Sequence, residues 1–161
     1  MKLFWVTLVE LLLLAVVCIA SWRTKKYISK AERVAIFLMF GSMTSDFIII
    51  MSMNNQFWKH GIQGPIPLAL NLMNRVVVLP LMGTLFVNDY AGRLGLLPKL
   101  RVFGKWLLLF IGVGYLFVWL DLLRYLHWEW YWSIPEWTVK LLVTLGFYKF
   151  YQYLLRREEF L

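Results

Sequence analysis

The chain has a single cysteine, few histidines and few acidic residues. Its 161 residues include 1 Cys, 2 His and 9 Asp or Glu, against 17 Lys or Arg. One cysteine excludes an intramolecular disulfide, and the scarcity of Cys and His leaves no cluster of the kind that holds zinc. Cys18 is interpreted as a small apolar packing residue. We therefore expect neither a metal nor a cofactor.

Enzyme motifs and soluble stretches are also missing. The chain has no nucleophile elbow and no glycine-rich phosphate loop between a strand and a helix. Hydrophobic residues make up 61% of the chain and aromatic residues 18%, which is typical of an integral membrane protein. The net charge is +8, but no soluble basic module carries it, so we expect no nucleic-acid partner.

Apolar segments long enough to cross a bilayer fill most of the sequence. A hydrocarbon core about 30 Å thick needs roughly 20 mostly apolar residues per helix. Five such segments lie near residues 3–22, 34–53, 66–87, 105–124 and 137–155. Because the connecting loops are short, the helices must supply the core themselves. The predicted fold is all-α, a single polytopic transmembrane domain over residues 1–161 that forms a five-helix bundle.

The basic residues predict the orientation of this bundle. Lys and Arg in short loops are retained on the cytoplasmic side of a membrane. Twelve of the 17 fall on one predicted side: Arg23, Lys25, Lys26, Lys30, Arg33, Arg93, Lys99, Arg101, Lys105, Lys149, Arg156 and Arg157. We therefore predict that the N-terminus is outside and the C-terminus inside. The basic inner rim is also suited to attract anionic lipid.

Four charged residues lie inside the predicted segments: Glu10, Asp46, Arg75 and Asp121. A charge in hydrocarbon costs about 2.5 to 3.5 kcal/mol, so it normally faces a bundle interior or a water-filled cavity and has a partner. With a helical rise of about 1.5 Å per residue, all four lie in the middle or outer half of the bundle. This pattern predicts a polar pocket that is reached from outside.

Polar neighbours on the same helix faces extend this pocket. Asn71, Asn74 and Arg75 form one stripe, and Ser42, Ser45 and Asp46 form another, because positions three and four apart share a face. If the stripes converge, Arg75 pairs with Asp46 and the asparagines satisfy the remaining donors and acceptors. The alternative is that these polar groups only fasten helices together, since polar contacts between helices are common in membrane proteins.

The predicted pocket has more acidic than basic residues, which bears on the choice between these two interpretations. Three acids face one arginine in the predicted pocket, so at least one acid must be protonated, solvated or matched by a bound cation. Arg124 and Lys140 lie near the outer helix ends and are available to neutralise part of the surplus. A cation site and local neutralisation both remain open at this point.

The predicted outer loop before the last segment, residues 127–137, is rich in tryptophan and includes Trp128, Glu129 and Trp130. One interpretation is an aromatic belt at the membrane interface. Another is a lid whose rings and acids bind a cationic or amphiphilic ligand by cation–π contact, completed by Phe57, Trp58 and His60 from the other outer loop. A third is a metal or acid–base site, built from the two histidines with Glu129 or Glu136.

The C-terminal half carries a resemblance. The resemblance lies in the run RVVVLPLMGTLFVN at 75–88, the run FVWLDLLRYLHWEWYWS at 117–133 and an aromatic last helix ending in Arg156 and Arg157. With these features, this half of the chain resembles a family of small uncharacterised multi-helix membrane proteins from spore-forming Gram-positive bacteria. The residues that match the family pattern are Pro80, Asn88, Asp121, Tyr125, Trp128 and Trp130. Asp121 stands where the family carries Glu. The resemblance implies a bacterial cytoplasmic or spore membrane and transfers no activity.

These observations favour a small integral membrane binding protein or accessory subunit. Its acid-rich pocket in the outer half of the bundle would take a cationic or polar ligand or a partner helix. The expected partners are membrane lipids and either a membrane protein or a second copy of the chain. No catalytic residue is predicted. The candidate ligand-binding residues are Glu10, Asp46, Asn71, Asn74, Arg75, Asp121, Trp128, Glu129 and Trp130.

Two alternative functions remain open. The first is a small proton- or cation-coupled transporter or channel, in which Asp46, Glu10 and Arg75 form a relay. The second is a membrane-embedded enzyme acting on a lipid, in which Asp121, Glu129 and the histidines serve as acid and base. The sequence favours these less, because the inner half of the bundle offers no acid to continue a pathway and no enzyme motif is present.

Overall fold

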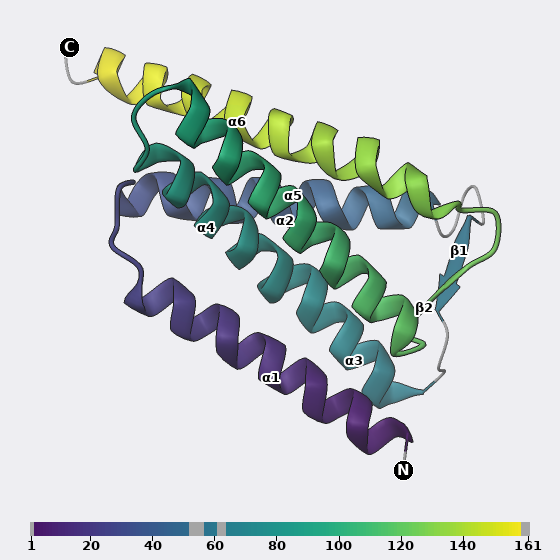
Figure 1. Ribbon diagram of the computed structural model, residues 1–161. Helices are drawn as coiled ribbons and strands as arrows, with labels where there is room; N and C mark the ends of the chain where they lie inside the picture. Colours follow the sequence, from purple (N-terminus) through teal and green to yellow (C-terminus); the bar gives the residue numbers. More distant parts are fainter. Residues whose placement is uncertain (1, 52–56, 61–63, 159–161) are drawn as a thin grey trace.

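The computed structural model describes residues 2–51, 57–60 and 64–158, and in these the chain forms a bundle of five long helices (Figure 1). The prediction of an all-α bundle is therefore confirmed. The helices are α1 (Lys2–Arg23), α2 (Lys30–Ile49), a continuous third helix made of α3 (Pro65–Met73), η2 (Asn74–Val78) and α4 (Leu79–Ala91), α5 (Leu96–Trp119) and α6 (Ser133–Glu158).

Three helices within this described part are long and apolar enough to cross a membrane: Leu3–Arg23, Pro65–Ala91 and Leu96–Trp119. Many of their outward side chains are apolar and exposed, as expected for surfaces that meet lipid. The helices α2 and α6 are of similar length but carry more charged and polar residues. Few residues in the apolar stretches of α1 and α5 are buried, whereas most residues in that of the third helix are buried inside the bundle.

The helix α2 begins at Lys30, four residues before the apolar segment that predicted it. Ser29 forms a capping box, in which its Oγ accepts from the Glu32 backbone N–H at 3.2 Å and Glu32 Oε2 accepts from the Ser29 N–H at 2.6 Å. The buried face then follows Ile36, Phe40 and Thr44 at intervals of four residues. Apolar periodicity alone missed this start because the first turn is polar.

The third helix contains a π-helical turn at Asn74–Val78, and Pro80 explains it. Proline has no N–H, and its ring clashes with the carbonyl four residues earlier in an ordinary α-helix. The wider turn, in which the Leu79 N–H donates to the Asn74 carbonyl, absorbs this conflict without breaking the helix. The turn also places Asn74 toward the bundle interior, where it is buried.

The core is a row of aromatic rings between α2, α4, α5 and α6. Phe40 stacks on Phe110 with ring centroids 5.5 Å apart, and Phe110 stacks on Trp137 at 4.7 Å. Gly83 of α4 makes room for this row, because a Cβ at that position would lie 2.5 Å from the ring of Phe40. The third helix also approaches α2 closely at Gly41, where a Cβ would lie 3.2 Å from the ring of Pro80.

At the end of the bundle that carries the C-terminus, Asn88 ties the first interhelical loop to α4. Its Oδ1 accepts from the Tyr27 N–H and its Nδ2 donates to the Lys25 carbonyl, each at 2.9 Å, and the side chain is buried. Because one amide satisfies two backbone groups, Asn88 is the anchor of this loop.

Replacing Asn88 with alanine is expected to lower stability by about 1 to 3 kcal/mol, because it leaves these backbone groups without their partner. Asn88→Asp keeps the acceptor for Tyr27 but loses the donor, so its melting temperature should fall between those of the parent and of Asn88→Ala. Thermal melting in neutral detergent measures both. An unchanged melting temperature for Asn88→Ala would contradict the anchoring role.

The outer connections differ most from the prediction. The helix α5 runs from Leu96 to Trp119 rather than over 105–124, so Asp121 lies beyond the helix and not in its outer third. It adopts a left-handed backbone with φ of 61°, which ends the helix and turns the chain. The predicted helical position of Asp121 is therefore wrong, because apolar sequence continues past the turn that this residue makes.

A two-stranded sheet follows this turn. The strand β2 (Leu123–Tyr125) pairs antiparallel with β1 (Trp58–His60), so that the two predicted outer loops are joined (Figure 1). Neither strand was predicted. The N-terminus lies at the same end of the bundle as the sheet, and the C-terminus lies at the other end.

Candidate functional site

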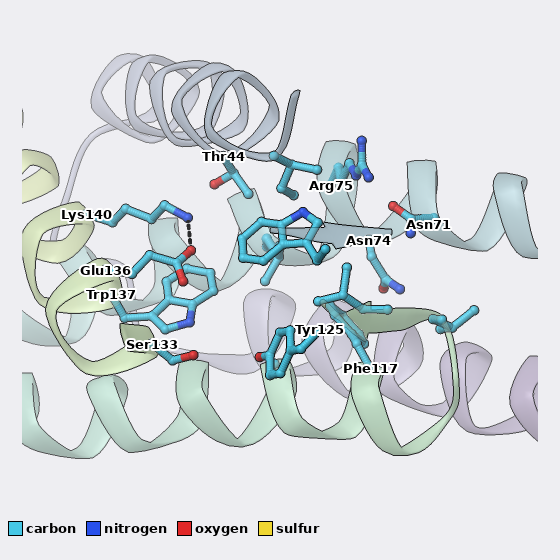
Figure 2. Close-up of a pocket in the computed structure, with 16 residues that line it drawn as sticks. Thr44, Asn71, Asn74, Arg75, Phe117, Tyr125, Ser133, Glu136, Trp137 and Lys140 are labelled. Atoms are coloured by element: carbon cyan, nitrogen blue, oxygen red, sulfur yellow. Dashed lines mark hydrogen bonds and ion pairs between the residues drawn. The ribbon is translucent and has the colours of Figure 1, made fainter. Parts of the chain in front are cut away.

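A cavity of about 70 Å³ lies inside the bundle next to the sheet. The elements α2, β1, the third helix and α6 contribute its polar lining, and Phe117 and Leu79 are among its apolar lining residues. Figure 2 shows Glu136 and Lys140 at one end of the cavity and Asn71, Asn74 and Arg75 at the other. Asn71, Asn74 and Arg75 of the predicted site are therefore brought together here.

Glu136 and Lys140 form a buried ion pair. Lys140 Nζ lies 2.5 Å from Glu136 Oε1, and the exposed fractions of the two side chains are 5% and 9%. The ammonium also lies 4.0 Å from the ring centroid of Phe47 and 4.4 Å from that of Trp137. Attraction to aromatic faces stabilises a cation removed from water. This pair is the most strongly buried charge arrangement of the site.

The spacing of the two residues in the sequence favours this pair, although the pair was not predicted. Glu136 and Lys140 are four residues apart, with the acid nearer the N-terminus, which is the favoured order for a helical ion pair. Lys140 was expected only to neutralise charge near the helix end, and Glu136 was placed in the loop. Both conclusions assumed that the last helix begins at residue 137, whereas α6 begins at Ser133.

At the other end of the cavity, Asn74 joins the third helix to α1. Its Nδ2 donates to Glu10 Oε2 at 2.7 Å, and both side chains are buried. Glu10 thus lies in the bundle interior, as expected for a charged residue within an apolar segment. Glu10 itself does not line the cavity, because Asn74 stands between them.

The predicted ion pair between Arg75 and Asp46 does not form, and this prediction was wrong. Arg75 lines the cavity but makes no ion pair with any residue that the structure describes. Asp46 is exposed on another face of α2, because Thr44 is the residue of that turn that points into the bundle. Two residues along a helix correspond to about 200°, so both cannot face the core.

Several polar atoms of this region lack a hydrogen-bond partner within the described part of the chain. Four of them line the cavity: Thr44 Oγ1, Trp58 Nε1, Asn74 Oδ1 and Arg75 Nε. Buried polar groups in proteins are nearly always hydrogen-bonded, and about 70 Å³ accommodates a few water-sized molecules. The cavity walls offer such molecules donors from Trp58 and Arg75 and an acceptor from Asn74.

Tyr125 and Ser133 close the cavity on the side of the sheet. Figure 2 shows the Tyr125 hydroxyl directed toward the Ser133 side chain, and Trp128 Nε1 donates to Ser133 Oγ at 3.2 Å. Burial raises the pKa of the Tyr125 hydroxyl, which therefore stays protonated and available as a donor. These contacts hold β2 and the loop at 127–132 against the start of α6.

A second and larger hollow lies between α2 and α6, which we call the α2–α6 groove. It has a volume of about 840 Å³ and a mainly apolar lining. Its polar lining residues are Asp46, His127, Glu136 and Lys140. The Glu136–Lys140 pair thus lines both the groove and the internal cavity, and separates one from the other.

An aromatic cluster forms the outer wall of this groove around Trp128. The ring of Trp128 lies 4.9 Å from that of Trp58, 6.1 Å from Phe57, 6.2 Å from Phe47 and 6.4 Å from Trp132. Edge-to-face contacts of this kind are favourable between aromatic rings. Phe57 and Trp58 of the one loop therefore contact Trp128 of the other. The lid itself stays a prediction.

Three predicted residues lie apart from both hollows. Asp121 binds Arg124 through both carboxylate oxygens, at 2.5 and 2.9 Å, so the predicted local neutralisation is present. Glu129 and Trp130 are exposed beside the short turn η3 (Trp130–Trp132). None of the three lines the cavity or the groove.

The interpretation of a metal site gains no support from the described residues. Within 2–51, 57–60 and 64–158 no group of three His, Cys, Asp or Glu side chains is close enough to hold a metal ion. The side chain of His60 lies outside the described residues.

Comparisons with known proteins identify no relative, since no family model, curated protein or solved structure matches the chain. The resemblance to membrane proteins of spore-forming bacteria therefore stays a prediction.

Proposed function

We propose that this chain is a small membrane protein that binds a cationic amphiphile in the α2–α6 groove. The observation that carries the proposal is the combination of a large aromatic hollow with an acid, Asp46, that has no basic partner among the described residues. Asp46 lines the groove and forms no ion pair with any residue that the structure describes. An amine or quaternary ammonium group supplies the missing charge.

The charges of the groove favour a cation over an anion. Glu136 is already neutralised by Lys140, so Asp46 leaves one unmatched negative charge in the groove lining. The faces of Phe47, Trp128 and Trp132 add negative quadrupole density, which attracts cations, most strongly when water is excluded. Lys140 over Phe47 already shows this type of contact within the groove.

The size and lining of the groove favour an amphiphile over a bare ion. Small-molecule sites usually enclose about 300 to 1,000 Å³ and are mainly apolar with a few polar groups, and the α2–α6 groove has both properties. Met43, Ile50, Met51 and Val139 offer flexible apolar contacts for an alkyl chain or ring. The head group would lie near Asp46, with the apolar part along these residues.

The membrane placement we propose is that all five helices cross the bilayer, with the N-terminus outside and the C-terminus inside. Clustering of the basic residues near the helix ends opposite the sheet supports this orientation. The groove then lies in the outer half of the bundle and is reached from the outer leaflet. This position fits a receptor or accessory subunit that takes its ligand from outside or from the lipid phase.

The test is a titration of the purified protein in phosphatidylcholine nanodiscs with dodecyltrimethylammonium and, in parallel, dodecyl sulfate. Quenching or shift of tryptophan fluorescence reports occupancy next to Trp128. We expect saturable binding of the ammonium compound and only weak, unsaturable partitioning of the sulfate. Equal responses to the two head groups would refute recognition of a cation.

The variant Asp46→Asn keeps the shape of the groove and removes its unpaired charge. A quaternary ammonium group has no N–H, so it is attracted to the carboxylate by charge alone. Opposite unit charges about 4 Å apart attract each other by about 1 kcal/mol in water and about 4 kcal/mol near a protein surface, so dodecyltrimethylammonium should bind about tenfold more weakly. Asp121→Asn is the matched control, because that acid is bound to Arg124 away from the groove. If both variants bind the ammonium compound like the parent, Asp46 is not its counter-ion.

A further inference from the structure

The opposite end of the bundle has a separate hollow with the opposite charge. It has a volume of about 410 Å³ and lies where α4 turns into α5, lined by Arg93, Pro98, Arg101, Val102 and Lys105. Figure 1 places this turn at the same end as the C-terminus and far from the sheet. We call it the basic groove.

One acid organises two of its three cations. Asp89 Oδ1 forms an ion pair with Arg93 Nη2 at 3.3 Å. Asp89 Oδ2 contacts Lys105 Nζ and accepts a hydrogen bond from Trp106 Nε1 at 3.2 Å. Asp89 therefore holds Arg93 and Lys105 beside the groove while cancelling only one of their charges. Hydrogen bonds from Lys105 and Trp106 hold this carboxylate in place despite its partial burial.

Arg101 adds a third cation without a partner. It is exposed, lines the groove and forms no ion pair within the part of the chain that the structure describes. Three cations against one acid leave an excess of two positive charges. A phosphate-containing group has the complementary charge, and the arginine fork can bind its oxygens in pairs.

Exposed leucines next to the groove point to a lipid as the source of that phosphate. Leu94, Leu96 and Leu97 have exposed fractions of 91%, 74% and 60%, and they lie directly between Arg93 and Arg101 in the chain. Apolar side chains so exposed beside basic ones are typical of a segment at the boundary between acyl chains and head groups. A soluble anion would gain nothing from them.

We propose that Arg93, Arg101 and Lys105 bind the head group of an anionic phospholipid, with Leu94, Leu96 and Leu97 against its acyl chains. Anionic lipid is attracted to basic residues at a membrane surface, and a groove with three cations selects it over zwitterionic lipid. This site is independent of the amphiphile site, because it lies at the other end of the bundle and has the opposite charge.

Native mass spectrometry of the full chain in neutral detergent tests this site, with phosphatidylglycerol, phosphatidylcholine and inorganic phosphate added separately. We expect phosphatidylglycerol to bind and to raise the melting temperature, and the other two to do neither. Arg101→Gln should weaken phosphatidylglycerol binding about fivefold, and Arg101→Lys less. Arg157→Gln is the control, since it removes an exposed cation near the same end of the bundle but outside the groove.

Arg101 forms no ion pair with a described acid, so Arg101→Gln should keep the parent melting temperature in the absence of lipid. Three results would each overturn the proposal. The first is binding of phosphatidylcholine equal to that of phosphatidylglycerol. The second is a loss of binding in Arg157→Gln as large as that in Arg101→Gln. The third is stabilisation by inorganic phosphate equal to that by phosphatidylglycerol, which would identify a soluble anion as the occupant.

Discussion

Replacing Lys140 with methionine is expected to destabilise the protein by about 3 to 5 kcal/mol, because it leaves the buried Glu136 carboxylate without its counter-ion. The ion pair is nearly inaccessible to solvent, with exposed fractions of 5% and 9%, so water cannot replace the lost ammonium. The loss also removes the cation from the faces of Phe47 and Trp137. A large drop in melting temperature in neutral detergent is the expected result.

The double variant Glu136→Leu/Lys140→Met measures the stability of the bundle when both charges of the pair are removed. A buried pair replaced by apolar residues of similar volume is often as stable as the original, so the double variant should recover most of the melting temperature. Lys149→Met, on the exposed face of the same helix, is the control and should change stability by at most about 0.5 kcal/mol. A double variant no more stable than Lys140→Met would show that the two charges are not energetically coupled.

This comparison also bears on function. If the pair only fastens α6, the double variant should bind dodecyltrimethylammonium like the parent. If the pair shapes the head-group end of the α2–α6 groove, the double variant should fold but bind less well. Ligand binding by the double variant thus shows whether the ion pair only stabilises the fold or also belongs to the binding site. The sequence left this question open.

Replacing Gly83 with alanine is expected to lower the stability of the protein substantially. The added Cβ would lie 2.5 Å from Cδ2 and 2.6 Å from Cγ of Phe40, and this ring is fully buried and stacked on Phe110. These atoms are the base of the ring rather than a flexible end, so the helices α2 and α4 must separate or the ring must leave its place. Overpacking of this kind costs about 1 to 3 kcal/mol.

Two further variants test this steric explanation. Phe40→Leu/Gly83→Ala should be more stable than the sum of the separate effects predicts, because the smaller side chain leaves room for the methyl group. Gly104→Ala in α5 is the matched control, since a Cβ there meets no atom within 4 Å. It should be neutral or stabilising by up to about 1 kcal/mol, because alanine favours a helix over glycine. Equal melting temperatures for Gly83→Ala and Gly104→Ala would contradict the close approach of α2 and α4.

The class of protein and the outline of the bundle could be predicted from the sequence. Apolar segments of about 20 residues are a local property, since each helix satisfies its own backbone hydrogen bonds. The helix boundaries were less accessible, because caps and turns override hydropathy at the ends. The capping box of Ser29 and Glu32 starts α2 before its apolar segment begins. The left-handed backbone of Asp121 turns the chain just after α5.

The members of the site could be predicted only in part. Asn71, Asn74 and Arg75 share one helix face, so a local rule brought them to one cavity, and burial of Glu10 followed from its apolar surroundings. The partner of each charge is not a local property. Asp46 lies on the groove face of α2, and Arg75 faces the cavity, because the rotation of each helix is set by Thr44, Phe40 and their neighbours in the core.

The sequence by itself determined a helical chain with segments apolar enough to cross a membrane, charged residues within these segments, and one basic end. These properties depend on composition and on spacing along one chain. The tertiary structure alone decided that Glu136 and Lys140 form the buried ion pair between two hollows, that β1 joins β2, and that Asp46 is left without a basic partner among the described residues. Such pairings depend on how helices far apart in the chain rotate and pack, and no periodicity in one segment encodes that.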